Sequence, residues 1–115
     1  MRLSDEELRL LNLFSYTVLT LRDKYSDFDK IEDPITLAFA DYITYGEDFR
    51  YTKAIYSKRE IPFDKDKIIA LICTGTDSQN RSLAIDRELA YACKINILLD
   101  ERKIKSTLFN SIKYQ

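Results

Sequence analysis

The first quarter of the chain has the spacing of apolar residues that is typical of an amphipathic helix. Leucine, phenylalanine and valine recur every three or four positions, at Leu8, Leu11, Phe14, Val18 and Leu21. Three further leucines widen this face, namely Leu10, Leu13 and Leu19. Ser4 and Glu7 match a capping box, in which the two residues satisfy backbone N–H groups at a helix start. The pattern predicts a helix over residues 4–24 that packs on more than one neighbour.

A second helix is predicted to begin at Asp33 and Pro34. Aspartate is a favoured N-cap, and proline suits the first helical position because an N–H there would be unpaired anyway. The apolar face that follows consists of Ile35, Ala38, Phe39, Tyr42 and Ile43. Gly46 can end this helix in a left-handed conformation.

The stretch from Phe49 to Phe63 has a different period. Three apolar or aromatic residues alternate with polar or small ones, at Phe49, Tyr51 and Ile55 against Arg50, Thr52 and Ala54. Residue types that favour strands are common here, and Ile61-Pro62 ends the run. The segment is therefore predicted to form a short strand or hairpin.

The remaining chain carries further helix signals. Asp64 can cap a helix over residues 65–73 that Gly75 would close. Asp77 or Ser78 is predicted to start another helix, with core residues Leu83, Ala84, Leu89, Ala92 and Cys93. After Asn96, a last helical segment is predicted from Ile97, Leu98, Ile104, Leu108 and Ile112. Together these signals predict a mainly α single domain over residues 1–115, a compact bundle of four to five helices with a short β-hairpin insertion.

A competing interpretation concerns residues 67–99, because short apolar runs fit a helix or a strand. Residues 67–73 would be a buried strand, residues 82–94 a crossover helix and residues 96–99 a second parallel strand. This alternative is a small α/β fold with a βαβ unit. The residues near its ligand-binding edge would be Gly75, Thr76, Asp77, Ser78, Asp86 and Glu88. The loop lacks a Gly-rich phosphate signature.

Composition narrows the classes of function. At 115 residues, 45% of them hydrophobic and 32% charged, the chain fits one globular domain. It contains no histidine, which removes Ser-His-Asp and Cys-His arrangements and His-based metal centres. Cys73 and Cys93 lie in apolar stretches and are expected to be buried thiols in a reducing compartment. We therefore expect a protein that is not an enzyme and that uses no cofactor and no metal.

The N-terminal residues do not resemble a secretory signal. Arg2 is followed by Asp5, Glu6 and Glu7, with no uninterrupted apolar stretch behind them. No run approaches the ~18–20 apolar residues that a membrane span needs. The expectation is a cytoplasmic protein with no membrane partner.

Positive charge is concentrated in two short segments of a chain whose net charge is −1. Residues 49–59 contain four cations and no acid, and residues 101–115 contain four cations and one acid. Cations beside aromatic rings are typical of proteins that bind single-stranded nucleic acid. The candidate nucleic-acid-binding residues are Arg50, Tyr51, Lys53, Tyr56, Lys58, Arg59, Arg102, Lys103 and Lys105. The alternative explanation of the first segment is a solvated strand edge.

Several short strings follow the layout of a known family. They are residues 25–31 (YSDFDKI), the end of the expected β excursion at residues 59–62 (REIP), and residues 89–92 (LAYA) in the closing helical half. The chain resembles the small-subunit family of type I-A CRISPR Cascade complexes. The resemblance implies a small, mainly helical, non-catalytic subunit, present in several copies, that supports nucleic acid in an RNA-guided antiviral complex. A subunit of this kind would be expected to be more basic than a net charge of −1.

Three functional hypotheses follow. The first is a subunit of a nucleoprotein assembly, whose partners are other protein subunits and single-stranded DNA or RNA. The second is a small protein-binding inhibitor or adaptor, of viral origin, that presents its acidic first half to a basic partner. The third is an α/β nucleotide-binding domain that uses the Gly75–Ser78 loop and Glu88.

Overall fold

The computed structural model describes residues 3–101. Five α-helices form this part of the chain, and two single 3₁₀ turns, Phe28–Lys30 and Gly46–Asp48, lie between them. The helices are α1 (Asp5–Lys24), α2 (Pro34–Tyr45), α3 (Thr52–Lys58), α4 (Lys65–Thr74) and α5 (Arg87–Glu101).

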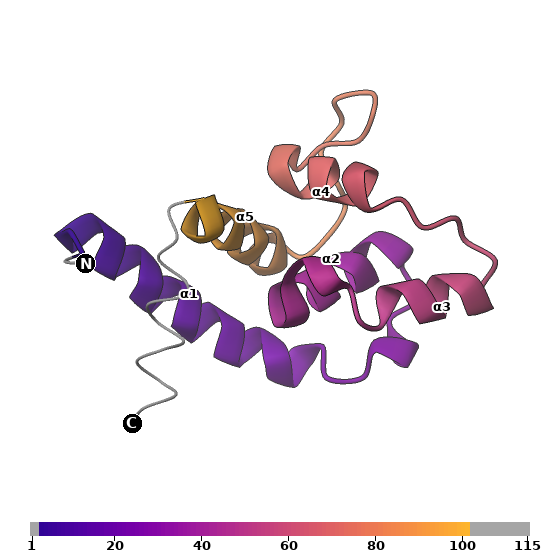
Figure 1. Ribbon diagram of the computed structural model, residues 1–115, viewed down its shortest axis with the longest axis horizontal. Coiled ribbons are helices and arrows are strands. Elements are labelled where there is room, and N and C mark those ends of the chain that lie inside the picture. Colours follow the sequence, from indigo (N-terminus) through magenta and orange to yellow (C-terminus); the bar gives the residue numbers. More distant parts are fainter. Residues whose placement is uncertain (1–2, 102–115) are drawn as a thin grey trace.

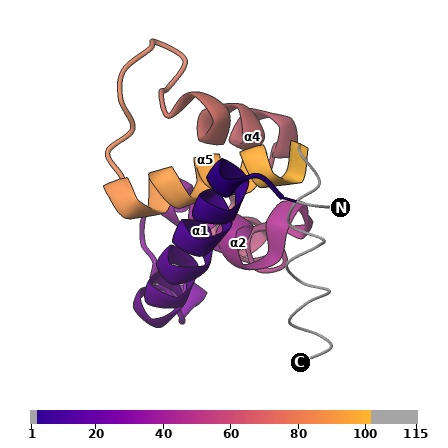
Figure 2. The ribbon, with the colours of Figure 1, turned by 90° about the vertical axis from the view of Figure 1, so that its left-hand side faces the viewer.

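Helix α2 is the centre of the bundle, and each of the other four helices packs against it (Figure 1). Seven consecutive residues of α2, Leu37 to Ile43, are buried, so this helix is covered on every side. Helices α1 and α5 also pack on each other, and α4 packs on α5. A second view shows α1 on the outside of the bundle, with α5 and α2 behind it (Figure 2). The core is therefore organised around α2 and α5.

The helices with their own start signals form as predicted. Ser4 Oγ accepts the N–H of Glu7, and the Ser4 N–H donates to the Glu7 carboxylate, which completes the capping box of α1. Asp33 accepts the N–H of Thr36 at the start of α2, and Asp64 accepts that of Lys67 at the start of α4. Each signal works because both partners lie within one helical turn.

Glycine ends two of these helices. Gly75 closes α4 as predicted, in a left-handed conformation at φ 70° and ψ 13°. Gly46 ends α2 as predicted, but not in the left-handed helical conformation that was expected: its φ 66° and ψ −146° lie in a region of the backbone map that is essentially restricted to glycine. The predicted helical bundle is therefore confirmed, and three of its predicted helices start or end where the sequence signals place them.

The predicted β-hairpin over residues 49–63 is wrong, because residues 52–58 form helix α3. The described part of the chain contains no strand; one isolated bridge joins Thr76 and Ser82. Phe49 adopts φ 44°, outside the β region, and its ring is fully buried. Thr52, Ile55 and Tyr56 are buried at helical spacing, whereas the alternation that suggested a strand includes the exposed Tyr51.

The βαβ alternative for residues 67–99 is also wrong. Residues 67–73 belong to α4 and residues 96–99 to α5, which runs through Asn96 without a break. The helix expected to start at Asp77 or Ser78 starts only at Arg87, and residues 75–86 form a loop. Asp77 accepts the N–H groups of Gln79 and Arg81, which holds this loop in a turn instead of a helix.

The core residues of the second half are only partly those expected. Leu89, Ala92 and Cys93 are buried, Leu83 is half-buried and Ala84 is exposed. Cys73 is exposed, so the expectation that both thiols are buried is wrong for this residue. The predicted final turns at Ile104, Leu108 and Ile112 lie outside the described residues.

Asp86 connects the end of α1 to the start of α5. Its Oδ2 accepts hydrogen bonds from the Lys24 ammonium and the Tyr25 hydroxyl, and its Oδ1 accepts the N–H of Glu88. The bond from Lys24, opposed by desolvation and supported by the N–H of Glu88, holds the pKa of Asp86 below its usual value. Asp86 is therefore both the N-cap of α5 and a contact between two helices.

Asp86→Ala is expected to lower the free energy of unfolding by about 1–2 kcal/mol at neutral pH, because a cap and a hydrogen bond from Tyr25 are lost. The folded pKa lies below the unfolded one, so the stabilisation is present above about pH 4 and is lost as the pH falls through the folded pKa. Urea unfolding between pH 3 and 7 measures both effects.

Asp77→Ala is the matched control, because Asp77 also has a lowered pKa but bonds only within its own loop. We expect it to change the free energy of unfolding by less than Asp86→Ala does. If the Asp86→Ala variant were as stable as the wild type at pH 7, Asp86 would not join the two helices.

Candidate protein and nucleic-acid interfaces

The basic-aromatic segment of the sequence folds so that one of its two tyrosines is enclosed. Tyr56 is 5% exposed and its hydroxyl donates to the carbonyl of Pro34. Its ring meets that of Phe63 edge to face, with the centroids 6.1 Å apart. Burial raises the pKa of Tyr56 to about 12. The ring therefore belongs to the core and offers no open face to a nucleobase.

Arg59 is engaged with the backbone of the protein itself. Its guanidinium donates to the carbonyls of Asp29 and Glu32, at 3.1 and 3.2 Å. These bonds tie the end of α3 to the segment between α1 and α2. A phosphate group would have to compete with these two carbonyls for the N–H donors of the guanidinium.

The other cations of this segment lie at the surface. Arg50 lies over the ring of Tyr45, with its guanidinium carbon 5.1 Å from the centroid, and Lys53 lies over that of Phe63 at 5.8 Å. Lys58 is exposed and forms no ion pair with a carboxylate in residues 3–101. These three side chains can reach an anion without breaking a hydrogen bond inside the protein.

Tyr51 is part of an aromatic cluster that the sequence did not reveal. Its ring is stacked on that of Phe28, with centroids 4.8 Å apart and planes inclined by 21°, and lies 5.5 Å from that of Tyr45. Tyr51 remains 45% exposed. The three rings come from three separate elements, so no local spacing could have predicted that they lie together with Arg50.

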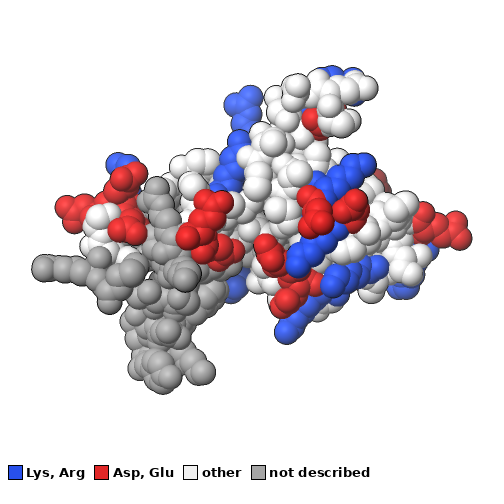
Figure 3. All heavy atoms as spheres, turned by 45° about the horizontal axis from the view of Figure 1, so that its top comes forward, with Lys and Arg blue, Asp and Glu red and all other residues white. Residues whose placement is uncertain are grey.

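The remaining predicted nucleic-acid-binding residues, Arg102, Lys103 and Lys105, lie outside the described residues. Within residues 3–101 there are 13 lysines and arginines against all 19 aspartates and glutamates of the chain. On the face shown in Figure 3, basic side chains lie among acidic ones. Lys65, for example, lies 3.6 Å from the carboxylate of Glu47. The cations seen there do not form a surface of one sign.

The outer side of α1 is a different kind of surface. No charged residue occurs between Leu10 and Leu21, a run of 12 residues in a chain that is 32% charged. Four large apolar side chains are exposed on this helix, and one from α5 lies beside them: Leu8, Leu13, Tyr16, Leu19 and Tyr91. Tyr16 and Leu19 are 74% and 64% exposed. We refer to these five residues as the α1 face.

A shallow groove of about 330 Å³ runs through the α1 face between α1 and α5. It is lined by Leu13, Tyr16 and Tyr91, with Thr17, Thr20 and Glu88 at its sides. Each threonine hydroxyl donates to the carbonyl four residues earlier, at 2.8 Å for Thr17 and 3.1 Å for Thr20. Because these hydroxyl protons are already bonded, the groove can lose its water without leaving them unpaired.

The thiol of Cys93 is buried, and the potential metal ligands of this part of the chain are dispersed. Burial raises the pKa of the Cys93 thiol, which donates to the carbonyl of Phe39. Residues 3–101 contain no cluster of three or more histidine, cysteine, aspartate or glutamate side chains placed to hold a metal ion. The loop at Gly75–Ser78 has no strand behind it, so the edge of a parallel sheet that the nucleotide-binding hypothesis required does not exist.

Comparisons with family models, curated proteins and solved structures found no match to this chain. In the part that the structure describes, no helix combines the length and the apolar character needed to cross a bilayer.

Proposed function

We propose that this chain is a non-catalytic assembly subunit that binds a neighbouring protein through the α1 face, within a nucleoprotein complex. The observation that carries the proposal is the α1 face itself. A helix on the outside of the bundle presents large apolar side chains over three turns and no charge between Leu10 and Leu21.

Physical chemistry favours a protein as the occupant of this face. The centres of protein interfaces are depleted in charged residues and enriched in tyrosine and other large side chains. Contiguous apolar patches on the surface of a single chain are uncommon unless they are used, because their exposure to water is unfavourable. Tyr16 and Leu19 are the most exposed apolar side chains of the face, so we assign them the largest share of the binding energy.

Charges at the two ends of α1 indicate which charges the surface of the partner should carry. The first turn contains Asp5, Glu6 and Glu7, and the last turn contains Arg22 and Lys24. A fitting surface is apolar in its centre and basic where it meets the start of α1. Such charges at the rim of an interface act mainly on the association rate and on orientation.

Nucleic-acid contact is a separate part of the proposal. We assign it to the exposed Arg50, Tyr51, Lys53 and Lys58 and to Arg102, Lys103 and Lys105. The net charge of −1 provides no long-range attraction for a polyanion, so this contact would be local and would follow protein assembly. The resemblance to the small subunits of type I-A CRISPR Cascade complexes supports nucleic-acid contact within an assembly and implies a role in antiviral defence.

Combining Tyr16→Glu with Leu19→Glu in the full chain is expected to weaken binding of the neighbouring protein at least about thirtyfold. The loss of one central anchor that contributes about 2 kcal/mol already has this effect, and the introduced carboxylates would also be desolvated. The tagged full chain is purified from its source cells, and its partners are identified and quantified by mass spectrometry. Sedimentation velocity of the purified chain tests whether the partner is a second copy.

Ala70→Glu with Ala84→Glu is the matched control. It introduces the same charge at two exposed positions away from the α1 face, and circular dichroism verifies that both variants are folded. The control should retain the partner. Recovery of the same partners in the same amounts by the α1-face variant would contradict the proposal.

A specific observation also favours the small inhibitor or adaptor as a second candidate. Residues 1–48 contain 11 acidic and five basic side chains, which suits a basic protein partner. Both candidate functions involve the binding of a protein partner. Only the complex of the assembly subunit would also contain nucleic acid. Nuclease treatment of the purified complex distinguishes them, since only the assembly subunit should then lose material that absorbs at 260 nm.

A further inference from the structure

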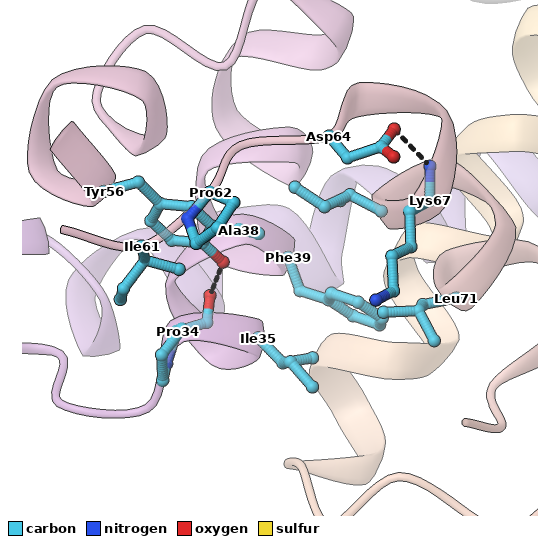
Figure 4. A pocket seen from close by; sticks show the side chains of 11 residues that line it. Pro34, Ile35, Ala38, Phe39, Tyr56, Ile61, Pro62, Asp64, Lys67 and Leu71 are labelled. Atoms are coloured by element: carbon cyan, nitrogen blue, oxygen red, sulfur yellow. Dashed lines mark hydrogen bonds between the residues drawn. The ribbon is translucent and has the colours of Figure 1, made fainter. Parts of the chain in front are cut away.

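A cavity lies on another side of the molecule, between the start of α2, the segment after α3, and α4. Its volume is about 210 Å³ and its wall is mostly apolar (Figure 4). Phe39 and Ile68 form its floor and are 1% and 7% exposed, while Ile35, Ile61 and Leu71 surround them. No residue of α1 lines it, so it is separate from the α1 face.

The walls of this cavity are held in place by the fold. The hydroxyl of Tyr56 donates to the carbonyl of Pro34, which fixes one wall, and this bond is drawn in Figure 4. Asp64 caps α4 through the N–H of Lys67 and fixes the opposite one. A cavity with such fixed walls can accept a side chain at a low entropic cost, because its shape exists before binding.

The size of the cavity decides what kind of ligand fits. Sites for drug-sized molecules usually have volumes of ~300–1,000 Å³. A cavity of about 210 Å³ is too small for that class but has room for one large apolar side chain. Pockets that receive a single aromatic or aliphatic anchor are the usual energetic centres of protein–peptide contacts.

Lys67 places a positive charge at the rim of the cavity, beside the position of the apolar side chain. Its side chain extends away from the Asp64 carboxylate, and it lines the cavity together with Phe39 and Leu71 (Figure 4). Lys67 forms no ion pair with any described carboxylate. Asp64 is on the same rim and keeps its negative charge, although one of its oxygens accepts the N–H of Lys67, so an acidic ligand residue must meet the Lys67 ammonium away from this carboxylate.

We propose that this cavity binds a peptide segment of a partner protein in which a large apolar side chain is followed directly by an acidic residue. The apolar side chain enters the cavity and is removed from water, which provides most of the affinity. The acidic residue pairs with Lys67 at the rim, which provides the selectivity. The inference does not depend on the function proposed for the α1 face.

The test uses the full chain labelled with ¹⁵N and three acetylated, amidated tetrapeptides: Gly-Phe-Asp-Gly, Gly-Phe-Asn-Gly and Gly-Phe-Lys-Gly. In titrations followed by amide chemical shifts, each should produce saturable changes around Ile68 and Leu71. The aspartate peptide should bind about threefold to fivefold more tightly than the lysine peptide, as expected for a partly exposed ion pair.

Lys67→Glu should reverse this preference, so that the lysine peptide becomes the tighter ligand, while the asparagine peptide changes little. Lys65→Glu is the control, because Lys65 lies on the same helix but does not line the cavity. It should keep the original order. The absence of saturable shifts with all three peptides, or a preference that Lys67→Glu leaves unchanged, would overturn the proposal.

Discussion

Replacing Asp41 with alanine is expected to lower the free energy of unfolding by about 3 kcal/mol or more. Asp41 lies in α2 and is fully buried. Its Oδ2 accepts hydrogen bonds from the N–H groups of Tyr51 and Thr52 and from the Thr52 hydroxyl, at 3.0, 2.8 and 2.6 Å. Alanine would leave all three donors without this acceptor.

The hydrogen bonds of Asp41 cap the start of helix α3. Helix α3 has no capping side chain of its own at its start. Asp41 takes over the role of N-cap from the neighbouring helix and binds the N–H groups at the first turn of α3. The loss should therefore be accompanied by faster hydrogen exchange of the amides in residues 52–58, measured by NMR, at denaturant concentrations where α1 and α5 remain protected.

Asp41→Asn tests whether α3 needs the hydrogen bonds of Asp41 or its negative charge. The amide oxygen of asparagine can accept the same three bonds, and the amide nitrogen would occupy the position of Oδ1, which has no hydrogen-bond partner in the structure. We expect this variant to lie within about 1 kcal/mol of the wild type. A loss of less than about 1 kcal/mol for Asp41→Ala would show that α3 does not depend on this contact.

The second large expected effect is an increase in the stability of the protein. Asn96→Leu is expected to raise the free energy of unfolding by about 1–2 kcal/mol. Asn96 lies in α5, is fully buried, and neither its Nδ2 nor its Oδ1 has a hydrogen-bond partner in the structure. Leucine has the same branching and removes both unpaired polar atoms from the core. Chemical denaturation of the two proteins under identical conditions measures the difference.

Asn96→Asp is the contrasting variant, because it places a carboxylate in the same position. A buried charge without a partner should lower the stability by about 3 kcal/mol or more at neutral pH and by less in acid, where the carboxyl group is protonated. If leucine destabilised the protein instead, the side chain of Asn96 would make a stabilising contact that leucine cannot replace.

The sequence was sufficient for the helices whose signals are local. The capping box of Ser4 and Glu7, the cap at Asp33, and the cap at Asp64 each involve partners three residues apart. Such interactions form wherever that short segment becomes helical, so they can be recognised without knowing what packs on it. Gly46 and Gly75 likewise end their helices through a backbone property that is their own.

Helix α3 shows where local signals were not enough. Its aromatic and β-branched residues favour a strand, and its cap comes from Asp41, 11 residues before Thr52. Nothing in the spacing of residues 49–63 reveals this acceptor. Local preferences of a few tenths of a kcal/mol per residue are easily exceeded by one set of buried hydrogen bonds.

The same limit applies to the candidate sites. The basic residues of 49–59 form one segment in the sequence, but the fold separates their roles. Arg59 binds backbone carbonyls, Tyr56 joins the core, and Lys58 stays in solvent. The cavity beside Lys67 combines three elements, and only their packing brings its apolar residues to one place.

The sequence by itself determined a mainly helical chain, the limits of its longest early helix, and a surplus of leucine on that helix. Only the tertiary structure decided that Leu11, Phe14, Val18 and Leu21 are buried while Leu8, Leu13 and Leu19 face outward. The period of a helix shows which residues share a side, but not how many sides its neighbours cover. Helices α2 and α5 cover one side of α1, and the other is left as the surface at which we expect a partner.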